Sequence, residues 1–484
     1  MMFITSLLRI LLSLSFLLFC NFASAQNLMS NTGLTDWPAF RTMVMENHPL
    51  ARQAGLFENQ ASAALLRARG EFDPKLYTDF ENKEFDGKTY FSHTEAGVKL
   101  PTGFGLQLRG SYNWASGTFL NPEMNLPEIG QAALGVEWSV FSGFFLDERR
   151  SGLRMAEIGV DQGVAERDML INTLLLEGAK VYWNWVLTLN QLIIFEEALR
   201  QANIRNVGIR EQYLNGANPA IDTLESYIQV QNREMDINFA RVDLQNARLM
   251  MTNFIWLEDQ TNVNSEMLGV PPDLIQGAYG KLSDQELETL RSIGRTNHPE
   301  LQFYDAMLRI LEVERRFKNA KRMPVLDVNY NLLGNGWEFL PYTSPEDGLA
   351  VMATDIKWGI NFSYPLLNRK ARGDLQITDV KIAQTGQTVL QKRQEIDNKI
   401  MQYANELNTL SNQIVLYRDI TTNYRILLDG EMEKFRMGES TVFLINIREQ
   451  RWIDAQIKFL KLLSEYRKTK AALYASAGVM TTME

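Results

Sequence analysis

The sequence contains almost no cysteine. Among its 484 residues only Cys20 is a cysteine, and it lies within the first 25 residues. This segment, 1–25, has the features of a secretory signal peptide: Arg9, a run rich in Leu and Phe, and the small-residue exit Ala23-Ser24-Ala25. Cleavage after Ala25 leaves a cysteine-free mature chain, which suits an oxidising compartment. Zinc–thiolate sites and cysteine nucleophiles are thereby excluded.

The chain also lacks basic blocks and long apolar runs. Without Arg9, the 49 basic residues become 48 against 58 acidic ones, and the net charge changes from −9 to −10. Nucleic acid is excluded as a partner, because its binding relies on clustered Lys and Arg. After the signal peptide no stretch approaches the roughly eighteen consecutive apolar residues of a transmembrane helix. Any membrane-spanning part of this chain must therefore consist of strands.

Two tripeptides hold two of the three histidines. Asn47-His48-Pro49 precedes Pro74, which comes 27 residues after the Asn, and Asn297-His298-Pro299 precedes Pro324 at the same spacing. The histidines could form a ligand pair, or the tripeptides could occupy equivalent places in two copies of one structural plan. The equal spacing favours duplication, with Pro opening a helix in each copy.

Proline is scarce where long helices are expected. None occurs from 128 to 218 or after Pro365, so helices are permitted there. From Ile396 to Phe435 apolar residues recur in steps of four and three, and the same register fits 174–213. This period of 3.5 predicts supercoiled helices in both halves. A helix of roughly 68 residues is about 100 Å long.

These observations predict a mainly α protein with β strands and an internal duplication. The first repeat spans 26–256, a connecting segment spans 257–285, the second repeat spans 286–479, and 480–484 form a tail. The first repeat is expected to hold a helix at 36–70, strands within 76–142, a long helix at 146–213 and a return helix at 219–256. The second repeat is expected to hold a helix at 299–321, strands within 325–364, a long helix at 366–436 and a return helix at 441–475.

Several predicted strands alternate between apolar and polar residues. In 105–114 the apolar set is Leu106, Leu108, Tyr112 and Trp114, and the segments 134–140 and 355–364 alternate in the same way. Ten-residue strands with a Trp- and Tyr-rich apolar face are typical of outer-membrane barrels. An ordinary antiparallel sheet with one face on a core has the same pattern. The predicted signal peptide favours the barrel, and the small number of strands requires several chains to share it.

The ordered motifs of the two halves resemble those of the TolC-like outer-membrane efflux proteins, also called outer membrane factors. The resemblance covers 34–479. It rests on NHPL and NHPE, similar to the family's Asn-Pro-Glu-Leu, on the strand-to-helix passages VFSGFFLDERRSGLRMAEI and YPLLNRKARGDLQI, and on the turns YLNGANPAIDTLESYIQVQN and FRMGESTVFLINIREQRW.

The resemblance implies a homotrimer in the outer membrane with a large periplasmic extension. Each chain would give four strands to a twelve-stranded transmembrane β-barrel and its coiled-coil helices to a periplasmic α-barrel. The implied partners are a periplasmic adaptor protein, an inner-membrane pump and outer-membrane lipid. Extra residues in the first repeat, around 85–114, suggest an additional hairpin beyond this pattern.

No catalytic arrangement is found in the sequence, and no metal or cofactor is expected. His93 lies in strand-like sequence without a Ser-His-Asp or His-rich spacing. Asp222 and Glu225 resemble the paired acids that line the family's periplasmic aperture; alternatively, they only favour the N-terminus of the following helix. By resemblance, the turns where adaptors dock include Tyr213, Gly216, Pro219, Phe435, Gly438 and Ser440.

Three function classes remain at this stage. An outer-membrane channel of a tripartite efflux or type I secretion system, conducting substrates passively, accounts for the signal peptide, repeat, helices and strands together. A secreted or periplasmic coiled-coil scaffold accounts for the helices and leaves the amphipathic strands without a role. A periplasmic enzyme accounts for the length and lacks a site.

Overall fold

The computed structural model describes residues 36–122, 125–140, 147–258, 261, 273–339 and 355–483. The predicted signal peptide lies outside these residues. The chain divides into two compact units. Unit 1 comprises 1–55, 167–299 and 393–484, and unit 2 comprises 56–166 and 300–392. Two long helices, α5 (Glu148–Leu214) and α9 (Arg369–Arg436), run through both units.

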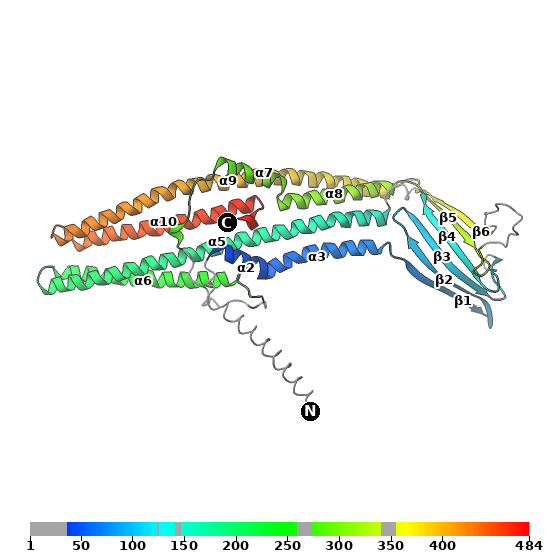
Figure 1. The fold of residues 1–484 in the computed structure, drawn as a ribbon, viewed down its shortest axis with the longest axis horizontal. Helices are drawn as coiled ribbons and strands as arrows, with labels where there is room; N and C mark the ends of the chain where they lie inside the picture. The colour runs from blue at the N-terminus through cyan, green and yellow to red at the C-terminus, as the bar shows by residue number, and fades with distance from the viewer. Residues whose placement is uncertain are drawn as a thin grey trace, which may run out of the picture. The chain divides into compact units, whose positions relative to one another are not determined.

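The other helices and the strands follow the order shown in Figure 1. The shorter helices are α2 (Trp37–Asn47), α3 (Pro49–Gly70), α6 (Ala220–Thr252), η3 (Leu274–Gln276), α7 (Asp284–Thr296), α8 (Pro299–Ala320), α10 (Val442–Ser476) and η4 (Met480–Thr482). The strands are β1 (Lys75–Phe85), β2 (Lys88–Pro101), β3 (Leu106–Ser116), β4 (Gln131–Ser139), β5 (Val325–Leu333) and β6 (Ile356–Ser363).

Unit 2 contains one six-stranded antiparallel sheet in the order β1-β2-β3-β4-β5-β6. The expectation of four strands, which came from the family resemblance, is wrong for this chain. The first half contributes four strands and the second half two, so the additional hairpin suggested by the residues around 85–114 is present. The positive φ of Asp86 and Gly87 forms the tight β1–β2 turn that this hairpin requires.

The two-residue alternation of the strands gives the sheet two different faces. Partners in register lie on the same face: Leu108 pairs with Val136, Val136 with Tyr330, and Tyr330 with Trp358. The opposite face carries charged and amide side chains, among them Arg109, Glu137 and Asn329. One face is therefore apolar across the sheet and the other is largely polar.

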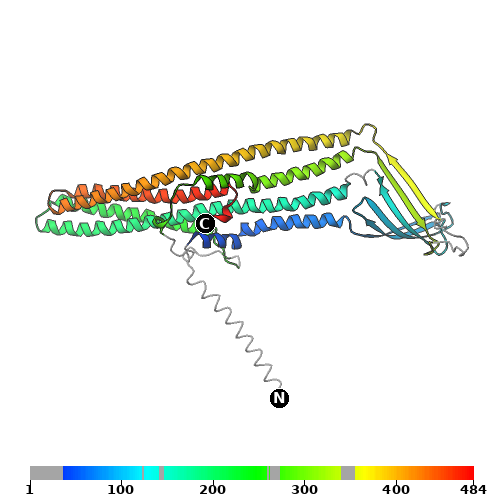
Figure 2. The same cartoon turned by 45° about the horizontal axis from the view of Figure 1, so that its top comes forward.

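The helices of unit 2 lie side by side in the order α3, α5, α8, α9 in both views (Figures 1 and 2). Gly163 of α5 has no side chain, and a Cβ there would stand 2.9 Å from the Cβ of Ala61 on α3. Ion pairs link Arg309 on α8 to Asp161 on α5 at 3.1 Å and Arg315 on α8 to Asp379 on α9 at 2.6 Å. These exposed pairs order the layer and add little stability.

Unit 1 is built from two helical hairpins, α5–α6 and α9–α10. The positions buried along α6 recur in steps of four and three: Ser226, Val230, Arg233, Ile237, Ala240, Leu244, Ala247 and Met251. On α9, the buried residues include Ile396, Ile400, Leu407, Leu410, Ile414 and Leu428, all members of the predicted 3.5-residue register. An aromatic cluster of Trp37, Phe40, Tyr182 and Trp185 packs α2 against α5.

The segment 36–70, expected as one helix, is two helices that meet at His48. His48 is extended (φ −65°, ψ 134°), because the following Pro49 disfavours helical dihedrals at the residue before it. The backbone N–H of Leu50 donates to its Nδ1 at 3.0 Å, so the imidazole caps α3. The other ring nitrogen, Nε2, then carries the proton and donates to the carbonyl of Asn253 at 3.1 Å. His48 thus joins the ends of three helices.

The equivalent segment of the second half contains a helix that the sequence analysis did not predict. α7 begins after Ser283, whose hydroxyl accepts a hydrogen bond from the N–H of Glu286 at 3.2 Å. A Ser followed three residues later by Glu is a helix-start signal, and it lies just inside the expected connecting segment. The predicted tail is also packed, because Met480 and Met483 are buried.

The stability of unit 1 should depend on the protonation state of His48. Burial lowers the pKa of His48 below its ordinary value of 6.5, against the opposing effect of its hydrogen bond to Asn253. Just below pH 6.5 the unfolded chain binds more protons than the folded one, so stability falls as the pH falls. We expect the thermal unfolding midpoint to decrease as the pH is lowered through 6.5. The control is His48→Asn, which keeps a capping acceptor without titrating, and an unchanged pH dependence in this variant would contradict the assignment.

Candidate functional site

The two turns that close the helical hairpins have the same geometry. Gly216 follows α5 with φ 74°, and Gly438 follows α9 with φ 78°. In each turn the glycine N–H bonds to a carbonyl three residues back, and the next N–H bonds to one five residues back: Ala217 to Gln212 at 2.8 Å and Glu439 to Lys434 at 2.9 Å. Left-handed glycine is what permits this helix ending.

The residues that flank these turns differ in detail. Pro219 is the N-cap of α6, with no side-chain hydrogen bond, and Tyr213 is 44% exposed. On the other turn, Phe435 is half-buried and the N-cap of α10 is Thr441. Sequence reasoning placed Ser440 at this helix entry. Its hydroxyl instead donates to Glu431 of α9 at 2.6 Å, and this hydrogen bond together with Arg448 holds the pKa of Glu431 below its ordinary value.

Asp222 and Glu225 lie in the first two turns of α6, both half-buried. The carboxylate of Glu225 accepts a hydrogen bond from the amide of Asn446 on α10 at 3.3 Å. Asn446 in turn accepts from Arg205 of α5 at 3.0 Å. The structure therefore joins Glu225 to a polar network between the two hairpins.

This network has at its centre an ion pair that the sequence analysis missed. Arg205 pairs with Glu449 of α10, whose side chain is 5% exposed. Arg233 of α6, with a side chain that is 1% exposed, donates to Gln450 of α10, the residue after Glu449, at 2.6 Å. The available signal was a polar residue at a position that the steps of four and three along α6 bury. Arg233 occupies such a position, whereas the register predicted from the sequence covered only 174–213 and 396–435.

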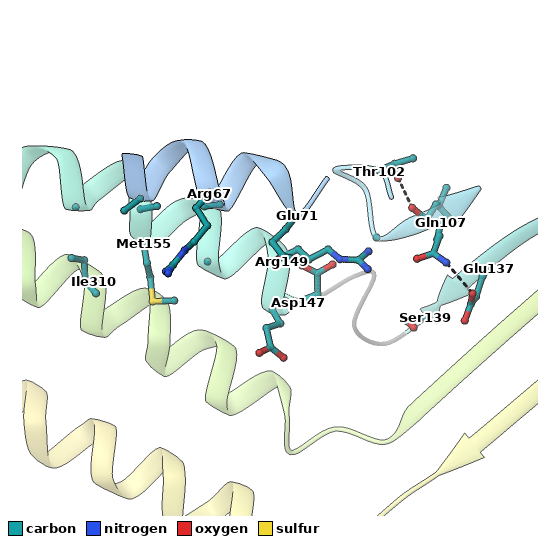
Figure 3. Close-up of a pocket in the computed structure, with 18 residues that line it drawn as sticks. Arg67, Glu71, Thr102, Gln107, Glu137, Ser139, Asp147, Arg149, Met155 and Ile310 are labelled. Carbon is teal, nitrogen blue, oxygen red and sulfur yellow. Dashed lines mark hydrogen bonds between the residues drawn. The ribbon is translucent and has the colours of Figure 1, made fainter. Parts of the chain in front are cut away.

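A second polar feature lies in unit 2, at the end of the sheet where the helices begin (Figure 3). A cavity of about 1100 Å³, the polar cavity, is lined by α3, α5, α8 and the neighbouring strands. Arg67, Glu71 and Arg149 line it from the helices. From the strands, the amide of Gln107 donates to Glu137 at 3.4 Å on the polar face of the sheet. The cavity therefore continues the polar face onto the helices.

The polar face of the sheet also carries a three-residue cluster. The phenol of Tyr77 donates to Glu95 at 2.5 Å and accepts from the Nε of Arg109 at 2.8 Å, and Arg109 also pairs with Glu95. Gly97 leaves the room for it, because a Cβ there would stand 2.8 Å from the Tyr77 hydroxyl. Charged groups on this face are thus held in place by neighbouring strands.

Across the ranges that the structure covers, no group of three or more His, Cys, Asp or Glu side chains is arranged to hold a metal ion. None of the helices in those ranges combines the length and apolar character needed to cross a bilayer.

Comparison with known proteins identifies the fold. No family model matches the sequence, and no curated protein does. Solved structures match over most of their length. The outer membrane protein VceC of Vibrio cholerae has a TM-score of 0.63 at 11% identity, over 91% of this chain and 96% of that chain. The open state of the MtrE outer membrane channel of Neisseria gonorrhoeae has a TM-score of 0.63 at 13% identity, over 91% of this chain and 88% of that chain. The CmeC outer membrane channel of Campylobacter jejuni has a TM-score of 0.62 at 11% identity, over 92% of this chain and 86% of that chain.

The chain has the fold of the TolC-like outer membrane channels. The resemblance found in the sequence motifs is confirmed at this level. In this outer membrane factor fold, the turns at Gly216 and Gly438 close the two helical hairpins, and the six strands form the sheet.

Removing one member of the Arg205–Glu449 pair should lower stability, because the other charge then stays buried without a partner. Arg205→Met is expected to cost about 3 kcal/mol, because it leaves the buried Glu449 carboxylate without its cation. The double variant Arg205→Met/Glu449→Met should recover most of this loss, since neither charge is then buried unpaired. The readout is the thermal unfolding midpoint in detergent.

The matched control for this pair is Arg200→Met, which breaks the exposed Arg200–Glu197 pair on the same helix. It should change stability by less than about 0.5 kcal/mol. If the double variant loses as much stability as the single variants Arg205→Met and Glu449→Met lose together, the two residues are not coupled.

Proposed function

We propose that this protein is the outer-membrane channel of a tripartite efflux or type I secretion system and conducts substrates passively. The observation that carries the proposal is the six-stranded sheet, apolar on one exposed face and polar on the other, within the fold of the outer membrane channels. The proposal assigns no enzymatic activity, cofactor or metal. Its setting is the outer membrane, with a large periplasmic extension.

The apolar face of the sheet supports contact with lipid. Many of its side chains are open to solvent in the part of the chain that the structure describes: Leu76 is 85% exposed, Trp358 64% and Phe362 62%. Exposed apolar surface of this extent is unfavourable in water and favourable in hydrocarbon. Trp and Tyr on the same face suit the boundary between lipid and water.

The edges of the sheet support assembly with further copies of the chain. Among the residues that the structure describes, the outer edges of β1 and β6 have no partner strand, and such edges favour pairing with another chain. Six antiparallel strands make β1 and β6 run in opposite directions, so the β6 edge of one copy can continue antiparallel onto β1 of the next. In a homotrimer, three copies of six strands supply a β-barrel of eighteen. Barrels of about sixteen to eighteen strands leave an aqueous channel.

The helices support the same assembly. Besides its buried seam, α6 carries a second apolar stripe at every seventh residue, between 46% and 69% exposed: Ile221, Ile228, Met235, Val242 and Leu249. The stripe lies about 170° around the helix from the buried seam, counted at 3.6 residues per turn. A helix with two seams packs against two neighbours, as the wall of a periplasmic α-barrel requires. The matched turns at Gly216 and Gly438 support internal duplication.

The proposed partners are a periplasmic adaptor protein and an inner-membrane pump. We assign the adaptor-docking surface to the turns that contain Gly216 and Gly438, with their flanking residues. We assign Asp222 and Glu225 to the periplasmic aperture, where three copies would bring the carboxylates together and favour cations. The alternative is a coiled-coil scaffold. It provides no apolar environment for the exposed apolar face of the sheet.

Disulfide trapping tests the trimer and its barrel. Cysteines are placed singly along β1 at Leu76, Thr78 or Phe80, each combined with a cysteine at Ile360 on β6. We expect at least one pair to give a cross-linked trimer when outer-membrane fractions are oxidised, because these edges meet between copies. Leu108→Cys on the central strand β3, combined with the same β6 cysteine, is the control and should give none. Recovery of the wild-type chain only from the soluble periplasm would refute the channel.

Ion selectivity tests the aperture assignment. Reversing both charges, Asp222→Lys/Glu225→Lys, should lower the cation preference of single channels in planar bilayers by several-fold, because like charges at a constriction repel cations. Glu211→Lys/Glu234→Lys changes the same number of exposed charges on α5 and α6 and serves as the control. Equal selectivity of the Asp222/Glu225 variant and the wild type would remove these residues from the pore.

A further inference from the structure

A second cavity in unit 2 has four arginines among its ten lining residues. It encloses about 600 Å³ where α3, α5 and α8 meet the β2–β3 turn. Its cationic residues are Arg69, Arg150, Arg154 and Arg316, and its one acid is Glu157. We call it the arginine pocket. A cavity of this size holds a small ligand or a headgroup.

The positive charge of the arginine pocket is only partly balanced within the chain. Arg154 pairs with Glu157 at 3.2 Å, and Arg150 pairs with Asp147 at 3.3 Å. Arg69 and Arg316 form no ion pair with any residue that the structure describes. The guanidinium groups of Arg69 and Arg316 therefore leave the arginine pocket positively charged, and an anion bound there is stabilised. Guanidinium groups match phosphate in particular, through paired N–H donors.

The walls between the arginines are apolar. Phe72, Leu153 and Val313 line the same space, and Val313 is buried. A free inorganic anion gains nothing from such walls, whereas a ligand that joins a phosphate to hydrocarbon fits both parts. The pocket therefore selects an amphipathic phosphate ester.

The arginine pocket and the polar cavity lie on opposite sides of the helix layer. On α5, Leu153 and Glu157 of the arginine pocket each stand two positions from Met155 of the polar cavity, about 200° around the helix. On α3, Arg69 of the pocket is likewise two positions from Arg67 of the cavity. The polar cavity opens beside Gln107 and Glu137 on the polar face of the sheet (Figure 3). The arginine pocket thus faces away from the proposed lumen.

The turn beside the pocket carries an exposed aromatic residue. Gly103 lines the pocket, and its neighbour Phe104 is 82% exposed. An apolar ring next to cationic side chains is the arrangement that suits the boundary of a bilayer, where hydrocarbon meets phosphate.

We propose that the arginine pocket binds the phosphate headgroup of an anionic glycerophospholipid from the membrane leaflet that faces the periplasm. This inference rests on the proposed outer-membrane setting. The guanidinium groups of Arg69 and Arg316 hold the phosphate, and Phe72, Leu153 and Val313 contact the glycerol and the first acyl carbons. Basic pockets beside membrane-embedded elements recognise anionic lipid in this way.

The test variant is Arg69→Gln/Arg316→Gln, and the matched control is Arg67→Gln/Arg149→Gln. Each removes two positive charges, and neither pair takes part in an ion pair within the described part of the chain. The full chain is reconstituted into nanodiscs of phosphatidylcholine that contain a minor fraction of phosphatidylglycerol, and the lipid retained after detergent extraction is measured by native mass spectrometry.

We expect the test variant to lose its preference for phosphatidylglycerol by roughly thirtyfold at low ionic strength, which corresponds to about 2 kcal/mol for two cationic side chains. The control should retain the preference of the wild type. Equal retention in the test variant and the wild type, or an equal loss in both variants, would overturn the proposal.

Two further arms separate the ligand source and the underlying function. Inorganic phosphate is added at the concentration of the anionic lipid; if it displaces the lipid, the pocket is a site for the free anion and the lipid proposal fails. Membrane fractionation and single-channel recording of the wild type test the channel itself. A wild type that conducts in the outer membrane while the test variant keeps its lipid leaves the proposed function intact and removes this inference alone.

Discussion

A helix of 67 residues cannot bury its apolar stripe against itself, and the arrangement of both halves depends on this constraint. Such a helix is about 100 Å long and needs neighbours along its whole length. The return helices α6 and α10, with 33 and 35 residues, cover only part of it, and the segments α3 and α8 supply further cover in unit 2. His48 and Pro49 are needed at the junction, because one helix must end and another begin there within the space of two residues.

Apolar groups within the helical seams stabilise the packing of the helices, whereas the polar groups among them determine how the helices are aligned. Replacing Arg205 and Glu449 with apolar residues that pack well need not reduce stability, because burying two charges costs about as much as their attraction returns. Separating the two charges is costly, because each would stay buried without its partner. The pair therefore disfavours any arrangement in which the hairpins slide along each other. Its position beside Glu225 ties the register of the hairpins to the carboxylate that we assign to the aperture.

In the sheet, side chains alternate between a polar and an apolar face with a period of two residues. Glycines on its polar face, such as Gly135 and Gly359, leave room for the amides of Asn331 and Asn329 on the neighbouring strand, so polar side chains can lie along the sheet. On the other face, most of the apolar side chains are exposed, among them Leu76, Trp358 and Phe362. The helix layer next to the sheet likewise has two cavities of different character on its two sides, a polar cavity of mixed charge and a pocket whose charged residues are four arginines and one glutamate.

Local patterns in the sequence were sufficient for the features that depend on a residue and its near neighbours. The heptad steps from Ile396 to Phe435, the two-residue alternation of 105–114 and the glycines of the hairpin turns are signals of this kind, and the structure has helices, a strand and left-handed turns there. The tertiary structure alone decided that His48 bonds to Asn253, that Arg205 meets Glu449, and that Arg69 and Arg316 share a pocket. These contacts join residues far apart in sequence. A local periodicity shows which side of a helix is buried, but it does not specify which residues of two different helices come into contact. The sequence thus determined which surfaces are apolar, and the packing of long helices determined which charges face each other.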